Sequence, residues 1–474
     1  MRGHGHWFAP TSLSWMPEGL LMRLTSSVPL FTCKGSVPKS PWARGLVLAG
    51  LLAAGVLGSP VRAATTLNSG TTTVSTGTDY GGPLYVATTG TATLNVIAGG
   101  NVTNTTGYLG FNAGSKGTAT VAGGGTAMVA NGSWNSGNYL YVGYRGAGTL
   151  NVSGGTWATN GNLTVGSSGT GTLTMSGGLV SVSGTVSQGT HGTIHLNSGG
   201  ALEIGVGGTT GVLGVSTLTN NGTLIFSRSN ASTYTGVLSG SGAVTKLGGG
   251  TLTLSGSSSY TGATAVNGGK LLVNGQLGNT AVAVNASGLL GGSGTILGNV
   301  TVGSSGTLAP GNSPGVFTVG SLSLLAGSHT LMEITGTAAG FYDQIVGTAL
   351  GGLTYGSSLN LVMTGSYADQ TTFQLFSNFS SNTGDFSAVG LNATGEYAGL
   401  TFAGDGGVWT STETANGQRL VFSTGTGDLI VVPEPSTWVM GAVGLACAAW
   451  GGFRRRKQSL RRCFRPPSTP PNRG

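Results

Sequence analysis

A short alternating segment that recurs along the chain restricts its fold more than any other feature. In residues 149–155, Thr-Leu-Asn-Val-Ser-Gly-Gly, apolar side chains occupy every second position before a glycine pair. This is the pattern of a strand with one buried face. Equivalent apolar pairs recur at spacings of 25, 31, 23 and 21 residues: Leu94/Val96, Ala119/Val121, Leu150/Val152, Leu173/Met175 and Ile194/Leu196. An upstream set repeats with them: Leu84/Val86, Leu109/Phe111, Leu140/Val142, Leu163/Val165 and Gly184/Val186.

Repeats of this length, each offering two or three short strands, predict a solenoid. One copy cannot bury its apolar face alone, so neighbouring copies must stack. The chain contains 91 glycines in 474 residues, and glycine allows the sharp corners that such coils need. A series of β-sandwiches is the alternative, and the nearly regular repeat favours the solenoid.

Charge is sparse and confined mainly to the two ends. Residues 1–63 carry a net charge of +5, residues 64–430 a net −4 and residues 431–474 a net +7. The six cations of the central region are scattered along it, so this region lacks the basic patch of a nucleic-acid-binding protein. Its lack of cysteine also excludes a disulfide framework or a thiolate metal site.

Two later segments carry a family resemblance. The first runs over residues 240–256, Gly-Ser-Gly-Ala-Val-Thr-Lys-Leu-Gly-Gly-Gly-Thr-Leu-Thr-Leu-Ser-Gly, and continues into residues 260–271. It resembles the autotransporter-associated β-strand repeat of passenger domains. Residues 308–315, Leu-Ala-Pro-Gly-Asn-Ser-Pro-Gly, are similar to the passenger segment that follows such repeats. The resemblance implies a right-handed parallel β-helix.

The N-terminal segment is typical of an export signal. Arg44 precedes an apolar stretch at residues 45–58, and Val-Arg-Ala at 61–63 provides a small-x-small cleavage pattern before Ala64. We therefore expect cleavage between Ala63 and Ala64. The residues before this stretch are unusual for a signal peptide, and Met22 offers an alternative start.

The C-terminal segment combines three parts in a fixed order. Pro433-Glu434-Pro435 precedes an uncharged apolar stretch, and the basic cluster Arg454, Arg455, Arg456 and Lys457 follows it. An apolar run of about 18 residues just spans a bilayer, and the basic cluster predicts a stop-transfer anchor. The order resembles the PEP-CTERM sorting signal, which implies processing by an exosortase near the Pro-Glu-Pro motif. A plain tail anchor is the alternative.

The predicted fold is therefore all-β: a right-handed parallel β-helix with a C-terminal β cap, an N-terminal signal helix and a C-terminal transmembrane helix. From about residue 330 the glycine rhythm fades and most acidic residues occur, which favours a polar cap. The expected divisions are a signal region (1–63), solenoid repeats (64–215), an autotransporter-associated repeat region (216–330), the cap (331–430) and the sorting tail (431–474) with a transmembrane helix at 436–453.

Some β-helices are enzymes, and glycoside hydrolysis needs two carboxylates at a set separation. Residues 80–330 contain one acid, Glu203, so no pair forms on those coils. A polysaccharide-active enzyme using carboxylates of residues 333–428 remains the alternative function. The acids there are Glu333, Asp343, Asp369, Asp385, Glu396, Asp405, Glu413 and Asp428. The sequence predicts no cofactor and no metal site.

The sequence thus predicts a non-enzymatic, exported structural or adhesin-like protein of the cell surface or extracellular matrix. It passes the inner membrane during sorting, with an exosortase as processing partner and extracellular polysaccharide as a candidate ligand. Aromatic residues gather between 108 and 157, and they predict either a sugar-stacking strip or side chains of the corners and core: Tyr108, Trp134, Tyr139, Tyr141, Tyr144 and Trp157.

Overall fold

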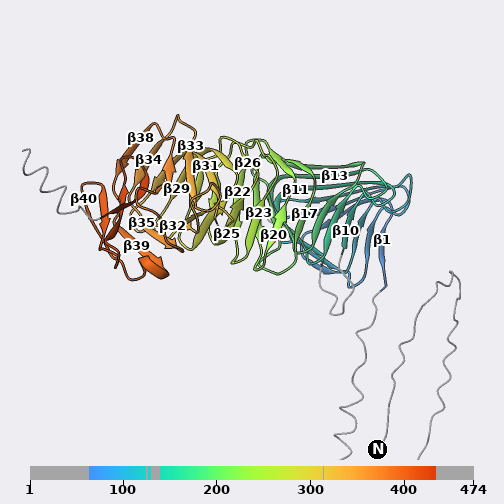
Figure 1. The fold of residues 1–474 in the computed structure, drawn as a ribbon. Coiled ribbons are helices and arrows are strands. Elements are labelled where there is room, and N and C mark those ends of the chain that lie inside the picture. The colour runs from blue at the N-terminus through green and yellow to red at the C-terminus, as the bar shows by residue number, and fades with distance from the viewer. Residues whose placement is uncertain (1–62, 124–125, 130–138, 313, 434–474) are drawn as a thin grey trace, which may run out of the picture. The chain divides into compact units, whose positions relative to one another are not determined.

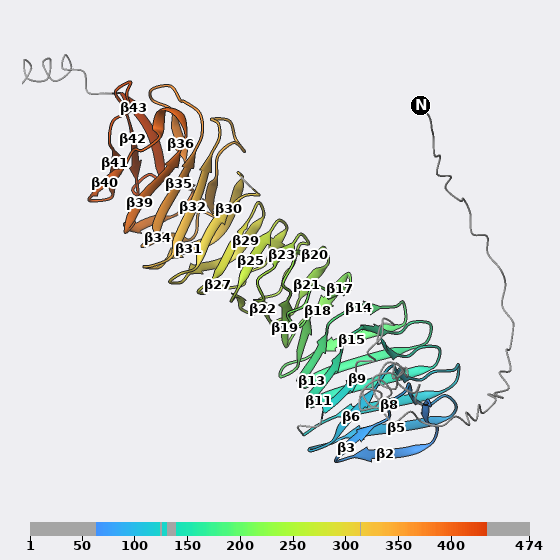
Figure 2. The same cartoon turned by 90° about the horizontal axis from the view of Figure 1, so that it is seen from below.

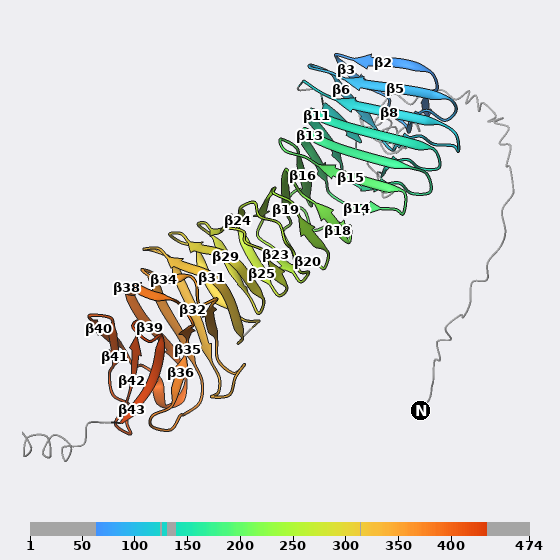
Figure 3. The ribbon, with the colours of Figure 1, turned by 90° about the horizontal axis from the view of Figure 1, so that it is seen from above.

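The computed structural model describes residues 63–123, 126–129, 139–312 and 314–433 (Figure 1). Most of the secondary structure of this region consists of parallel β-strands, as the alternating repeats predict. Strands of successive coils lie side by side in Figures 1 and 3. The first sheet contains, in spatial order, β1 (Thr65–Leu67), β4 (Leu84–Val86), β7 (Gly107–Leu109), β10 (Tyr139–Val142), β12 (Asn162–Val165), β14 (Thr185–Gln188) and β17 (Val212–Gly214).

The second sheet runs through most coils, and in the first coils it takes two strands from each. Its strands are β2 (Gly70–Val74), β3 (Gly77–Asp79), β5 (Thr91–Val96), β6 (Asn101–Asn104), β8 (Lys116–Val121), β9 (Thr126–Val129), β11 (Ala147–Thr159), β13 (Gly171–Val182), β15 (Gly192–Leu196), β16 (Ala201–Ile204), β19 (Thr223–Ser227), β22 (Ala243–Leu247), β24 (Thr264–Val266), β26 (Gln276–Leu277), β27 (Val282–Val284), β29 (Thr295–Val302), β31 (Val316–Leu324), β33 (Gln344–Gly347), β34 (Gly352–Tyr355), β37 (Phe376–Ser377) and β38 (Ser381–Gly384).

The later coils form a third parallel sheet. A separate two-stranded sheet, β18 (Thr217–Thr219) and β21 (Val237–Ser239), follows the last strand of the first sheet along the chain. The third sheet contains β20 (Ser232–Tyr234), β23 (Thr251–Leu254), β25 (Gly269–Val273), β28 (Gly288–Gly292), β30 (Thr307–Pro310), β32 (His329–Ile334), β35 (Ser358–Met363) and β39 (Ala388–Ala393).

The register of the second sheet confirms the main repeat. Leu94 pairs with Ala119, Ala119 with Leu150, Leu150 with Leu173 and Leu173 with Ile194. The second member of each predicted pair follows in the same register. Side chains at these positions are buried, because strand alternation turns every second residue inward. Each buried aliphatic side chain contributes about 1.5–3 kcal/mol.

The upstream repeat was predicted correctly where Leu140 and Val142 pair with Leu163 and Val165, but two of its five copies were placed with an error of two residues. Leu109 pairs with Val86 and Val142, and Gly107 occupies the inward position that Leu84 and Leu140 fill in neighbouring coils. Likewise Val186 pairs with Leu163 rather than with Val165. A shift of two residues preserves the inward alternation, and the missing side chain of Gly107 left the pattern ambiguous.

A corner between the first and second sheets depends on paired glycines. Gly143 follows β10 and adopts φ +80°, a left-handed conformation that glycine accepts without strain. A Cβ on Gly148 would lie 2.0 Å from the Gly143 nitrogen and 2.5 Å from the Leu109 carbonyl oxygen. The corner therefore has no room for a side chain at Gly148.

The end of the described chain changes to antiparallel pairing. Strands β36 (Thr372–Gln374), β43 (Asp428–Pro433), β42 (Gln418–Ser423), β41 (Val408–Ser411) and β40 (Phe402–Asp405) form this cap sheet (Figure 2). A short 3₁₀ helix, η1 (Gly395–Tyr397), precedes β40. Parallel coils continue as far as β39, well past residue 331, where the cap was expected to begin. Acidic residues and fewer glycines therefore did not mark the end of the coils.

The predicted signal helix and the predicted transmembrane helix at 436–453 lie outside the described residues. Within the residues that are described, no helix is long and apolar enough to cross a membrane.

Candidate functional site

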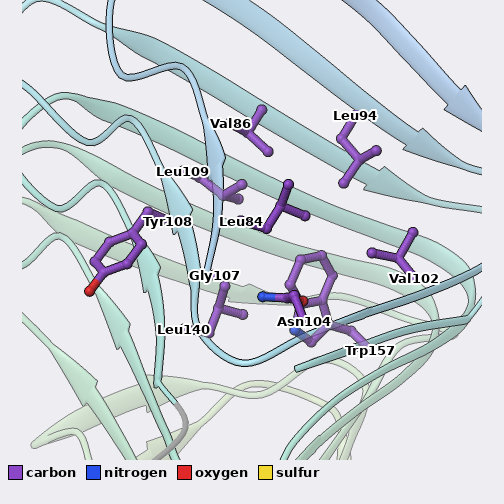
Figure 4. Close-up of a pocket in the computed structure, with 10 residues that line it drawn as sticks. All are labelled: Leu84, Val86, Leu94, Val102, Asn104, Gly107, Tyr108, Leu109, Leu140 and Trp157. Atoms are coloured by element: carbon purple, nitrogen blue, oxygen red, sulfur yellow. The ribbon is translucent and has the colours of Figure 1, made fainter. Parts of the chain in front are cut away.

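Three tyrosines form a stacked row on the outward face of the first sheet. Tyr85, Tyr108 and Tyr141 are register partners on β4, β7 and β10. The ring centroids of Tyr85 and Tyr108 lie 4.8 Å apart with planes at 4°, and those of Tyr108 and Tyr141 lie 5.2 Å apart with planes at 9°. The spacing follows that of adjacent strands. Figure 4 shows the Tyr108 ring extending away from the core side chains.

A second aromatic row stands beside the first, in the turns that follow the strands. Phe111 and Tyr144 stack at 5.3 Å and 12°, and both contact the edge or face of Tyr108 in T-shaped pairs. Tyr139, which is exposed, stacks on Tyr141 at 5.9 Å. We call these six side chains the aromatic ladder: Tyr85, Tyr108, Phe111, Tyr139, Tyr141 and Tyr144.

The ladder is half-buried and nearly free of charge. Each aromatic pair contributes about 0.5–1.5 kcal/mol beyond the burial of its area, so the ladder helps to hold the coils together. Burial raises the pKa of Tyr108 to about 12, with a further contribution from the neighbouring tyrosines. Arg145 is the cation beside the ladder, with its guanidinium carbon 5.5 Å from the Tyr144 ring centroid.

The sequence identified part of the ladder. Tyr108, Tyr139, Tyr141 and Tyr144 belong to it, whereas Trp157 is buried in the core with 5% exposure and Trp134 lies outside the described residues. Tyr85 was missed because the ladder crosses coils of unequal length, and Phe111 was wrongly predicted as an inward residue because of the register error at Gly107. A search for aromatic residues at the outward position of each coil finds Tyr85. The ring faces are largely occupied by neighbouring rings, so the ladder mainly presents ring edges and hydroxyl groups.

A small cavity of about 10 Å³ lies beneath the first sheet (Figure 4). Apolar side chains such as Leu94 and Val102 line it together with Asn104 and Trp157. Asn104 Nδ2 and Trp157 Nε1 make no hydrogen bond to the described residues. The volume corresponds to about one water molecule, so the cavity is too small for an organic ligand.

Asp343 is a buried structural carboxylate. Its Oδ1 accepts a hydrogen bond from the Gly315 N–H and its Oδ2 accepts one from the Glu333 N–H, each at 2.8 Å. Burial raises the pKa of Asp343 to about 7, while the two N–H donors lower it and the Glu333 carboxylate raises it. A Cβ on Gly311 would lie 2.8 Å from Oδ1, so the glycines of residues 308–315 make room for this carboxylate.

Two further acids of the C-terminal coils and cap have structural contacts. Asp385 accepts hydrogen bonds from the Trp409 indole at 2.8 Å and from the Gly407 N–H at 3.1 Å. Glu413 pairs with Arg419. These two residues line an open hollow of about 510 Å³ on the cap sheet, together with threonine and serine hydroxyls, and Glu413 is the one carboxylate in its lining. Hydrolysis by a carboxylate pair needs two.

Lys246 is a buried cation of the later coils, with 2% exposure. Its Nζ donates to the carbonyl oxygens of Leu247, Gly248 and Gly268 at 2.7, 2.8 and 3.0 Å. The last of these bonds joins two successive coils. Burial lowers the pKa of Lys246 to about 8.

The low pKa of Lys246 predicts a pH dependence of stability. Because the folded state releases the proton near pH 8 and the unfolded chain near 10.5, we expect Lys246 to contribute a rise in the free energy of unfolding between pH 8 and 10, seen as the difference between the wild type and a variant without this amine. Urea denaturation of the wild type and of Lys246→Met measures this slope, which the variant should lack. Lys270→Met serves as the matched control and should keep it; an equal slope in all three proteins would contradict the assignment.

The predicted processing residues stand at the limits of the described chain. Ala63 and Ala64 are exposed and directly precede β1, and Pro433 is the last residue of β43. Glu434, Pro435 and the basic cluster Arg454–Lys457 lie outside the described residues. Their roles therefore stay predictions.

Two segments of this chain are similar to parts of autotransporter proteins. Residues 244–273 match the family model described as Passenger-associated-transport-repeat. This is the segment that contains Lys246, and the match confirms the predicted repeat. A 90-residue stretch is 38% identical to the adhesin BmaC autotransporter of Brucella suis biovar 1 (strain 1330). The match covers 18% of this chain and 3% of that relative.

Proposed function

We propose that this protein is an exported, adhesin-like β-helix of the cell surface or extracellular matrix, wound in the right-handed sense. The observation that carries the proposal is the passenger-type repeat at residues 244–273, set within a continuous series of parallel coils. The similarity to an autotransporter adhesin supports the same role. The proposed function is one of structure and contact rather than catalysis.

Sorting is proposed to occur through the C-terminal tail. The Pro433-Glu434-Pro435 motif, the apolar stretch and the basic cluster resemble the PEP-CTERM signal, with an exosortase as the processing enzyme and the inner membrane as a transient location. Strand β43 ends at Pro433. A cut after this residue therefore leaves every described strand intact, and a cut before Ala64 does the same for β1.

Mass spectrometry of the protein from the surface and extracellular fractions of the native cell tests this proposal. We expect a mature form that starts at Ala64 and ends near Pro435. A variant with alanine at residues 433–435 should keep its tail, whereas alanine at the exposed Asp405 should leave processing unchanged. Recovery of the wild type in the inner membrane, with residues 437–457 still attached, would refute sorting and indicate a membrane-tethered protein.

A further inference from the structure

We infer that the aromatic ladder is a binding surface for a neutral polysaccharide chain. The ladder combines apolar ring edges with hydroxyl groups in rows that repeat at 4.8 and 5.2 Å. Threonine and serine continue the central row, because Tyr141 pairs with Thr164 and Thr164 with Ser187. Sugar chains present the matching chemistry, with C–H groups and hydroxyl groups at a regular repeat.

The charge around the ladder points to an uncharged partner. Residues 80–200 contain Lys116 and Arg145 and no acidic residue, and Arg145 packs over the Tyr144 ring. An acidic polymer would meet one cation at the ladder, Arg145. A basic polymer would meet no acidic side chain from residues 80–200. Binding through hydroxyl groups and ring edges therefore favours a neutral glycan.

The size and openness of the ladder argue against other classes of ligand. The ladder covers the width of three strands and about 15 Å along them, which gives it an area of roughly 200 Å². This area is far less than the ~800 Å² that each partner contributes to a stable protein interface. Among the described residues, the ladder lies on the outward face of the first sheet rather than in the enclosed pocket that small ligands require. A thin polymer lying across β4, β7 and β10 fits both conditions, and a second copy of this chain does not.

The decisive variant replaces Tyr108 and Tyr141 with threonine. Threonine is the residue that the fold itself uses at the register partners Thr66 and Thr164, so the coils should still form. Tyr108→Phe with Tyr141→Phe keeps the rings and removes the hydroxyl groups. Phe341→Thr is the matched control, because this aromatic side chain is 56% exposed and lies far along the chain from the ladder.

Binding is measured by depletion of the full-length chain, in a detergent without a sugar headgroup, onto microcrystalline cellulose and an insoluble β-1,3-glucan. Soluble alginate is the acidic comparison. We expect wild type and Phe341→Thr to bind at least one neutral glucan. The double threonine variant should bind at least tenfold more weakly, and the double phenylalanine variant should fall between the two. Near-ultraviolet circular dichroism checks that the variants are folded.

Three outcomes would overturn the inference: no binding to either neutral glucan, unchanged binding of a folded threonine variant, or salt-sensitive binding to alginate alone. Sedimentation adds a fourth, a wild-type dimer that the threonine variant dissociates, since the ladder would then join two copies. The inference rests on the proposed surface function for its biological setting. If the purified protein binds a neutral glucan but the native cell retains the protein internally, the surface function is refuted and the ladder assignment stands.

Discussion

Replacing Gly148 with alanine is expected to lower the free energy of unfolding by more than about 4 kcal/mol, in the range reserved for severe packing defects. The new Cβ would lie 2.0 Å from the Gly143 nitrogen and 2.5 Å from the Leu109 carbonyl oxygen. Both atoms belong to backbone, so neither can move aside as a flexible side chain does. The corner must open, which separates the first sheet from the second in this coil.

Gly249→Ala is the matched control. A Cβ on Gly249 meets no atom within 4 Å and its φ is not in the left-handed region. Alanine there should be neutral or stabilise by about 0.4–1 kcal/mol, because it restricts the unfolded chain. Urea denaturation of both variants measures the difference. Equal stability of the two variants would mean that the corner glycines are not required by packing.

The second large effect is expected at Asp343, whose folded-state pKa of about 7 lies above its usual value of 3.8. Between these two values the folded state binds more protons than the unfolded state, so the free energy of unfolding should fall as pH rises from 4 to 7. A shift of this size corresponds to about 4 kcal/mol when titration is complete. Unfolding by urea at pH 4, 5.5 and 8 follows the change.

Two substitutions separate the charge of Asp343 from its hydrogen bonds. Asp343→Asn should remove most of the pH dependence. Asp343→Ala should cost about 1–3 kcal/mol for each N–H, of Gly315 and Glu333, that loses its buried acceptor. Asp405→Asn, at an exposed carboxylate, should change neither property. A wild-type stability that rises between pH 4 and 7, or a dependence that persists in Asp343→Asn, would disprove the assignment.

Alternation within the strands made most of the coil architecture predictable. Leu150 and Val152 face inward because a strand turns every second side chain to the same side, and the recurrence of such pairs identified their partners in neighbouring coils. The passenger-type segment was identified instead by its resemblance to the autotransporter-associated repeat, which its glycines and Thr-Leu-Thr-Leu strand carry. The pattern of apolar residues gave the wrong register where glycine fills an inward position, as Gly107 does.

The candidate site was less predictable than the fold. Tyr108 and Tyr141 are separated by 33 residues along the chain and by 5.2 Å between ring centroids. Period-two alternation assigns both to an outward face without specifying which residues of two unequal coils stand opposite each other. The hydrogen bonds of Asp343 to residues 28 and 10 positions away are equally invisible to pattern analysis.

The sequence by itself thus determined an all-β chain of stacked parallel coils, since a repeated amphipathic strand can bury its apolar face only against its neighbours. Only the tertiary structure decided the aromatic ladder, the two backbone hydrogen bonds to the buried Asp343 carboxylate and the continuation of the coils to β39. These features depend on register between coils, and register is set by corner geometry and packing across loops of different length. Local periodicity carries no information about either.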